Sequence, residues 1–272
     1  MILFPNAKIN IGLDIIRRRP DGYHDISTVM YPTGWKDILE ITTSQSSETT
    51  LTVTGRKVDC PPEKNLVMKA YRRMAAEVSL PPVNIYLHKI IPDGAGLGGG
   101  SADAAFTLIG LNRLFDLGFD DKQLASMAGS IGADCAFFIY NRPMLCEGTG
   151  TTMRPIGLDL DSYKIIIVKP PVNIPTAQAY SGCTPREPET PLPYRLTLPI
   201  DQWGKCVHND FEAGITAAHP EIGEIKQRLL DLGAVYSAMS GSGSAVFGLF
   251  DHDILAETIR VEFPHYDIFV PQ

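Results

Sequence analysis

The 272-residue sequence lacks an excess of positive charge and a long hydrophobic run. Its 24 lysines and arginines are outnumbered by 31 aspartates and glutamates, and the formal net charge of −7 argues against a nucleic-acid-binding surface. No apolar run approaches the ~20 residues that a membrane-spanning helix needs. A strand pattern begins almost at Met1, which leaves no room for a targeting segment. We therefore expect a cytoplasmic protein without nucleic-acid or membrane partners.

Paired cysteines and a Walker A loop are also missing. The five cysteines, at positions 60, 135, 146, 183 and 206, are odd in number and form no C-x-x-C motif, so we expect reduced and mostly buried thiols. The one Gly-Lys pair, Gly204-Lys205, is followed by Cys206 rather than serine or threonine. With 44% hydrophobic and 20% charged residues, the chain has the composition of an ordinary globular protein of one large or two modest domains.

What the sequence does contain is a glycine-rich stretch, Pro92-Asp-Gly-Ala-Gly-Leu-Gly-Gly-Gly-Ser-Ala102. It follows residues 83–91, which have the composition of a strand, and precedes residues 102–115, whose apolar positions recur at helical spacing. Glycines let a backbone turn sharply or approach a ligand closely. A helix that begins after them offers unpaired N–H groups and a positive dipole end. This order predicts a phosphate-binding loop; the alternative is a flexible loop without a ligand.

A dinucleotide-binding fold does not fit this stretch, although Gly94, Gly96 and Gly99 match the G-x-G-x-x-G spacing. That fold needs an acidic residue about 20 residues further on, at the end of a second strand. Here Asp116 and Asp120 flank a turn at Gly118 and precede a helical pattern. The context therefore excludes a Rossmann unit.

Residues 7–13 alternate between apolar and polar side chains, which predicts a half-buried strand with Lys8 and Asn10 on the same face. From the pattern alone, Lys8 is an ordinary solvent-facing lysine. A basic turn then leads into Asp21-Gly22, a strong turn signal, followed by Tyr23 and His24. By itself this segment is a hairpin tip with a partly packed tyrosine.

Further strands are predicted at residues 26–31, 38–42 and 49–53, and Asn65 is placed to cap the helix that follows.

Asp134 precedes an apolar run at 135–139 that we interpret as a strand; without other information Asp134 is a cap or turn aspartate. A boundary near residues 155–161 predicts domains at 1–156 and 157–272. The proline-rich residues 182–199 suggest an extended surface loop. Residues 239–244 are too many for a tight hairpin.

Taken together, these segments resemble the GHMP kinase family. Its first motif, Lys-x-Asn, corresponds to Lys8-Ile9-Asn10. Its second, a proline followed after three residues by Gly-Leu-Gly, corresponds to Pro92 and Gly96-Leu97-Gly98. Its third corresponds to residues 239–244, and its Gly-Ala-Asp pattern to Gly132-Ala133-Asp134. Four positions depart from the family: Gly99-Gly100 replaces a common Ser-Ser, and Ala136 and Ser244 stand where proline is frequent.

The segment Arg19-Pro20-Asp21-Gly22-Tyr23-His24 is similar to a hallmark of the branch that phosphorylates 4-diphosphocytidyl-2-C-methyl-D-erythritol. The resemblance implies an α+β fold of two domains, the first like ribosomal protein S5 domain 2 and the second ferredoxin-like. It implies transfer of the γ-phosphoryl group of ATP to the 2-hydroxyl of that substrate, with Mg²⁺ as cofactor and protein ligands of the metal left open. The protein would be a monomer or a homodimer.

The resemblance also implies residue roles. Lys8 and Asp134 would be catalytic. The ATP-binding residues would be Asn65, Lys89, Pro92, Asp93, Gly94, Ala95, Gly96, Leu97, Gly98, Gly99, Gly100, Ser101 and Ala102. The substrate-binding residues would be Asn10, Tyr23, His24, Asp134, Thr176, Tyr180, Gly241 and Ser242, with Tyr23 stacking on the cytosine and His24 hydrogen-bonding it. The alternatives are a homoserine- or mevalonate-type kinase, which Tyr23-His24 disfavours, and a non-catalytic nucleotide-binding module, which Lys8 with Asp134 disfavours.

Overall fold

The computed structural model describes residues 1–58 and 60–271, which form two compact units. Unit 1 consists of Met1–Ala7, Gly34–Asp93 and Gly98–Arg142, and unit 2 of Lys8–Thr33, Gly94–Leu97 and the chain from Pro143 onwards. The chain thus passes between the units more than once, and the glycine-rich stretch contributes residues to both. No helix among the described residues combines the length and the apolar character needed to cross a bilayer.

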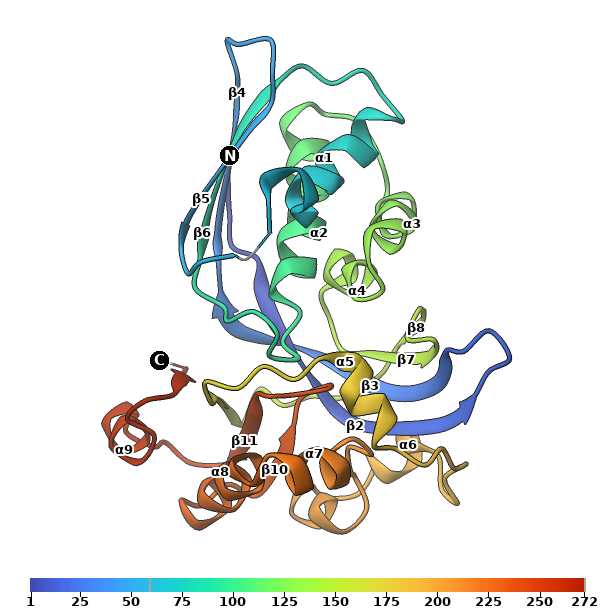
Figure 1. Cartoon of the computed structure of the whole chain (residues 1–272), viewed down its shortest axis with the longest axis vertical. Coiled ribbons are helices and arrows are strands. Elements are labelled where there is room, and N and C mark those ends of the chain that lie inside the picture. The colour runs from blue at the N-terminus through green and yellow to red at the C-terminus, as the bar shows by residue number, and fades with distance from the viewer. Residues whose placement is uncertain (59, 272) are drawn as a thin grey trace. The chain divides into compact units, whose positions relative to one another are not determined.

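Unit 1 contains a sheet with the strand order β1-β4-β6-β5, in which β5 and β6 are parallel and the other neighbours antiparallel. Helices α1 and α2 lie along one face of it, with α3 and α4 beyond them (Figure 1). The strands are β1 Ile2–Leu3, β4 Ile38–Thr43, β5 Thr50–Gly55 and β6 Val83–Lys89, and the helices are η1 Pro62–Lys64, α1 Leu66–Ala75, α2 Gly99–Leu114, α3 Asp121–Ile131 and α4 Cys135–Tyr140.

Unit 2 contains two sheets. The first has the order β2-β3-β7-β8, from β2 Asn6–Arg18, β3 His24–Lys36, β7 Met144–Gly148 and β8 Thr152–Pro155, and its first two strands begin or end in unit 1. The second has the order β10-β11-β9-β12 and is antiparallel throughout. Its strands are β9 Lys164–Lys169, β10 Tyr236–Met239, β11 Val246–Phe250 and β12 Asp267–Phe269.

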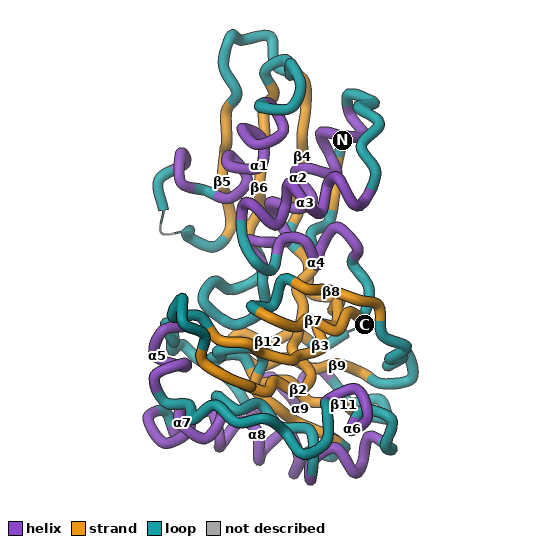
Figure 2. Tube along the Cα trace, turned by 90° about the vertical axis from the view of Figure 1, so that its right-hand side faces the viewer, coloured by secondary structure: helices purple, strands orange, loops and turns teal. Residues whose placement is uncertain are grey.

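The second sheet has the order 2-3-1-4 when its strands are numbered along the chain, which is the ferredoxin-like arrangement expected for the second domain. Helix α8 packs on β10 and β11, and Figure 2 shows α7 and α8 beside each other. The helices of unit 2 are α5 Thr176–Ser181, α6 Leu192–Arg195, η2 Ile200–Lys205, α7 Glu212–Ala218, α8 Pro220–Asp231 and α9 Ala256–Glu262. Buried residues of β2 and β3, such as Ile15 and Ile26, belong to the same core as Leu229 and Phe250.

Most predicted elements are confirmed, and four predictions are wrong in detail. Residues 135–139 are not a strand but most of helix α4, because a short apolar run that is buried on both faces does not distinguish the two structures. Residues 182–199 are not an extended loop throughout, since they contain α6, in which Leu192 is fully buried. Proline is tolerated in the first turn of a helix, and α6 has it there.

The other two corrections concern the strand of Lys8 and the start of α2. Strand β2 is not half-buried, because Lys8 and Asn10 on its polar face are as enclosed as the apolar residues. Helix α2 begins at Gly99 rather than at residue 102. A Cβ atom at Gly99 would lie 3.0 Å from Cγ2 of Ile91, so glycine lets the helix start close against the chain that leaves β6.

Candidate functional site

The start of α2 in unit 1 has the geometry of an anion site. Its N-cap is Gly98, whose φ of 71° lies in the left-handed region and whose lack of a side chain leaves the first N–H groups without a side-chain cap. Gly99, Gly100 and Ser101 form the first turn, and no acidic residue lies in it. The N–H groups and the helix dipole therefore favour a negatively charged ligand here.

Unit 1 also holds a cavity of about 320 Å³ beside this helix start. It brings together four residues predicted from the sequence to bind ATP, namely Asn65, Lys89, Asp93 and Gly100, with apolar side chains of Val58, Leu66 and Leu87. Asn65 caps α1 as predicted, because its Oδ1 accepts a hydrogen bond of 2.9 Å from the amide of Val67. The cavity has the size and the mixture of apolar and polar groups that suit a nucleoside.

Lys89 does not extend into solvent towards a ligand. Its side chain is 1% exposed, and its Nζ lies 2.5 Å from Oδ2 of Asp37 and 2.8 Å from Oδ2 of Asp103. The other oxygen of Asp37 accepts hydrogen bonds from the amides of Ile90 and Ile91. Two carboxylates thus hold one buried ammonium group and fix the end of β6 where the glycine-rich stretch begins. Asp37 and Asp103 were not among the residues predicted from the sequence.

The glycine-rich residues that belong to unit 2 are held by β2 and by the segment after β10. The amide of Lys8 donates to the carbonyl of Leu97 at 2.9 Å, and the amide of Ala245 donates to the carbonyl of Ala95 at 3.1 Å. Gly96 has a φ of +74°, and its carbonyl accepts hydrogen bonds of 2.9 Å from Lys8 Nζ and from Ser240 Oγ. The first and third predicted motifs therefore meet at the second.

Lys8 is 3% exposed, and its ammonium donates to Asn10 Oδ1 at 2.5 Å as well as to Gly96. The prediction that Lys8 and Asn10 share a face is confirmed, and the pattern-based expectation of a solvent-facing lysine is wrong. Asn209 Nδ2 donates to the carbonyls of Met239 and Gly241, which fixes the third motif. Removing so many polar groups from water costs free energy that their hydrogen bonds must offset, and such clusters of buried polar groups are typical of functional sites.

The aromatic residues predicted to bind the substrate also meet in unit 2. His24 stacks on Tyr180 with ring centroids 4.6 Å apart and an angle of 16° between planes, and Tyr180 packs edge-on against Phe211. Tyr23 is 67% exposed, and its amide is held by Asp21 Oδ1 at the hairpin tip. Thr176 and Ser242, two further predicted substrate residues, have their hydroxyl oxygens 3.4 Å apart.

Asp134 is half-buried at the N-cap of α4, where its side chain does not cap the helix. It belongs to unit 1, whereas Lys8 belongs to unit 2. Their joint role therefore stays a prediction.

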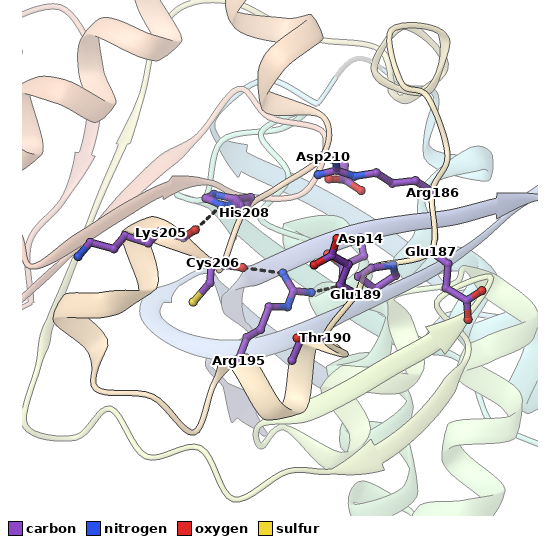
Figure 3. Close-up of a pocket in the computed structure, with 11 residues that line it drawn as sticks. Asp14, Arg186, Glu187, Glu189, Thr190, Arg195, Lys205, Cys206, His208 and Asp210 are labelled. Carbon is purple, nitrogen blue, oxygen red and sulfur yellow. Dashed lines mark hydrogen bonds and ion pairs between the residues drawn. The ribbon is translucent and has the colours of Figure 1, made fainter.

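A second cavity, of about 350 Å³ in unit 2, contains none of the predicted site residues. Figure 3 shows Arg195 between Asp14, with which it forms an ion pair, and the carbonyl of Cys206, to which its Nη1 donates at 2.7 Å. Burial raises the pKa of Asp14, and the Arg195 guanidinium opposes that shift. Two of the charged residues that line this cavity, Asp14 and Arg195, are thus paired with each other.

Comparison with known proteins defines the class. The family model for the GHMP kinases N terminal domain matches residues 65–142, and the model for the GHMP kinases C terminal matches residues 199–266. The chain belongs to the GHMP kinase family and has its two-domain fold. The five cysteines are free thiols, but only Cys135 and Cys146 are buried, so the expectation that most of them are buried is wrong.

Within that family, the chain is similar to 4-diphosphocytidyl-2-C-methyl-D-erythritol kinase of Bacteroides fragilis, with 49% identity over 92% of each chain. The enzyme of the same name from Cytophaga hutchinsonii is 41% identical over 92% of this chain and 93% of its own. A crystal structure of 4-(cytidine 5'-diphospho)-2C-methyl-D-erythritol kinase superposes with a TM-score of 0.83 at 29% identity, covering 99% and 98% of the two chains. Homoserine kinase from Cytophaga hutchinsonii, at 18% identity and a TM-score of 0.70, shares the fold.

The packing of Gly96 yields a first prediction. A Cβ atom there would lie 2.0 Å from the backbone oxygen of Ser240, so Gly96→Ala should displace the loop, raise the KM for ATP and lower the melting temperature. Gly118→Ala is the matched control, because Gly118 has the same φ of +74° and nothing within 4 Å of a Cβ atom. The Gly118→Ala variant should lose about 1–2 kcal/mol of unfolding free energy, because alanine is strained at a positive φ, and its KM for ATP should be unchanged. Equal effects of the two variants on the KM would contradict the loop geometry.

The Lys89 cluster yields a second prediction. Burial raises the pKa of Asp103 to about 7 from 3.8, and the nearby charge of Asp37 adds to that shift while Lys89 opposes it. Between these two pH values the folded state keeps a proton that the unfolded chain has lost, so stability falls as the pH rises through the interval.

Asp103→Asn removes this contribution. Relative to the variant, the wild type should lose up to about 1.4 kcal/mol of unfolding free energy per pH unit across that interval. Urea unfolding at a series of pH values measures the difference. Parallel stability curves for the two proteins would show that Asp103 titrates as it does in the unfolded chain.

Proposed function

We propose that the protein transfers the γ-phosphoryl group of ATP to the 2-hydroxyl of 4-diphosphocytidyl-2-C-methyl-D-erythritol, giving the 2-phosphate and ADP, a step of non-mevalonate isoprenoid precursor synthesis. The observation that carries the proposal is the hairpin tip at Tyr23-His24, where an exposed tyrosine stands beside an imidazole already stacked on Tyr180. This arrangement suits a pyrimidine base, which a homoserine or mevalonate kinase has no need to bind. The 49% identity to the Bacteroides fragilis enzyme supports it.

In this proposal the nucleoside part of ATP lies in unit 1. The base and sugar occupy the cavity lined by Asn65, Leu66 and Leu87, and Lys89 supports the wall of that cavity through its two carboxylate partners rather than through its own ammonium. The phosphates lie at the glycine-rich stretch from Pro92 to Ala102. No lysine or arginine occurs in that stretch, so backbone N–H groups would hold the phosphates.

Mg²⁺ would accompany ATP and neutralise charge on the transferred group. The hydroxyl of Ser101, in the first turn of α2, is a hard oxygen donor of the kind this ion prefers, and the phosphates and water would supply its other ligands. Gly99 and Gly100 have no side chain and therefore cannot supply a side-chain oxygen ligand to the metal.

Asp134 would accept the proton of the attacking hydroxyl, because it occupies the aspartate position of the family's Gly-Ala-Asp pattern and a carboxylate can act as a general base. Lys8 would stabilise negative charge on the transferred phosphoryl group, because its ammonium is fixed by Asn10 and by the carbonyl of Gly96 next to the phosphate-binding residues. Thr176, Ser242 and Gly241 would contact the diphosphate and sugar of the substrate. We place the enzyme in the cytoplasm, as a monomer or a homodimer, with these two small molecules as its partners.

The base-binding role of the hairpin tip is tested by Tyr23→Ala. The variant should bind cytidine 5'-diphosphate more weakly by about 1–3 kcal/mol, because a stacking surface is lost, and should bind ATP with unchanged affinity. Tyr194→Ala is the control, since Tyr194 is 68% exposed in the same unit and lies outside the proposed site. Isothermal titration calorimetry of both ligands decides. If cytidine and adenine nucleotides weaken equally, Tyr23 is a structural residue.

The chemical roles are tested by Asp134→Asn and Lys8→Ala. The first substitution keeps the shape of the side chain and removes the base, so kcat should fall at least about 100-fold with little change in substrate affinity. Lys8→Ala should have a similar effect. The double variant should lose much less than the product of the two factors, because both residues act on one step. An Asp134→Asn enzyme with near-normal turnover would leave positioning alone as the source of catalysis.

A further inference from the structure

Thr28, on strand β3, is hydrogen-bonded to Asn10, which in turn accepts a hydrogen bond from the Lys8 ammonium. Its side chain is fully buried. Its Oγ1 donates a hydrogen bond of 2.6 Å to the carbonyl oxygen of Gly12 and accepts one of 3.1 Å from Asn10 Nδ2. A hydroxyl has a single proton, and here the carbonyl of Gly12 takes it. Towards Asn10, Thr28 can therefore act only as an acceptor.

This restriction decides which way the Asn10 amide points. With its NH₂ group turned to Thr28, the amide presents Oδ1 to Lys8 Nζ at 2.5 Å. The reverse orientation would place an NH₂ donor against an ammonium, which has donors only. Asn10 is 3% exposed, so water does not compete for these groups. The chain of donors and acceptors from Gly12 through Thr28 and Asn10 to Lys8 has a single consistent direction.

We propose that Thr28 is a positioning residue for phosphoryl transfer, which fixes the Asn10 amide and through it the direction of the Lys8 ammonium. The inference rests on the catalytic role proposed above for Lys8. The hydroxyl of Thr28 is hydrogen-bonded to Asn10 and to Gly12, and of these two residues Asn10 is the one that contacts the Lys8 ammonium. Ser240 supports the same arrangement. Its Oγ accepts a hydrogen bond from the backbone N–H of Asn10 and donates one to the carbonyl of Gly96.

The test uses substitutions that differ only in the hydroxyl. Thr28→Val keeps the branched shape and removes the acceptor, which leaves Asn10 Nδ2 buried without a partner or lets the amide rotate. We expect kcat to fall by about 10- to 100-fold, the scale of a small misplacement of a catalytic group. The KM values for ATP and for the diphosphocytidyl substrate should change less than about twofold, because neither ligand contacts Thr28.

Thr28→Ser restores the hydroxyl and should restore kcat to within about threefold of the wild type, a loss too small to reflect a missing hydrogen bond. Should Thr28→Val fold poorly, Thr28→Ser and Thr28→Ala form a second pair that differs by one oxygen atom. Equal kcat values for serine and alanine, or for valine and threonine, would overturn the proposal.

A double variant separates this inference from the proposed function. If Thr28 acts through Lys8, Thr28→Val should lower kcat in the wild type but not further in the Lys8→Ala background. A structural defect would instead multiply the two losses, which would overturn the positioning role. If the Lys8→Ala variant retains near-normal kcat, the proposed role of Lys8 is wrong, and the positioning role of Thr28 is then wrong as well. If Lys8→Ala is impaired while Thr28→Val is normal, only the positioning role is wrong.

Discussion

The buried ammonium of Lys8 is the constraint on which the architecture of unit 2 depends. A lysine that is 3% exposed loses its hydration, and the cost is recovered only if hydrogen-bond acceptors surround it. One acceptor, Asn10 Oδ1, comes from the same strand, and the other, the carbonyl of Gly96, comes from the glycine-rich stretch. Satisfying this one charge therefore fixes the stretch against β2, and Ser240 then attaches the segment after β10 to the same carbonyl.

Unit 1 also contains a buried lysine, Lys89, but its ammonium group has partners of a different kind. Lys89 is as deeply buried as Lys8, but two carboxylates rather than neutral oxygens hold it. Burial, together with the nearby charge of Asp37, raises the pKa of Asp103 to about 7. A lysine already bound by two carboxylates is a poorer ligand for another anion than a lysine held by neutral oxygens, because the carboxylates neutralise its charge. The two buried lysines thus differ in their partners: Lys89 lies between two carboxylates, whereas Lys8 donates to an amide oxygen and a backbone carbonyl, and the proposed role in phosphoryl transfer is assigned to Lys8 for that reason.

The sequence was sufficient to predict features that depend on local signals. Asn65 before an amphipathic run, the glycines after a strand and the Asp-Gly turn before Tyr23 each specify a backbone conformation within a few residues. It was not sufficient for features that depend on residues far apart in the chain. Asp37 and Asp103 lie 52 and 14 positions from Lys89, and Thr28 lies on a different strand from Asn10. Alternation along β2 likewise could not show that its polar face is covered, because the covering residues come from elsewhere in the chain. Asp103 stands within the helix predicted after the glycines, so an acidic residue at that place was visible in the sequence, but its pairing with Lys89 was not.

Turnover with competing acceptors tests the central claim most directly. The enzyme is incubated with ATP, Mg²⁺ and equal amounts of 4-diphosphocytidyl-2-C-methyl-D-erythritol, homoserine and mevalonate, and phosphorus NMR follows the products. The account predicts that the diphosphocytidyl compound alone gains a phosphate, as a monoester on its 2-hydroxyl, while ADP accumulates in equal amount. Phosphorylation of homoserine or mevalonate with the diphosphocytidyl compound left unchanged would contradict it.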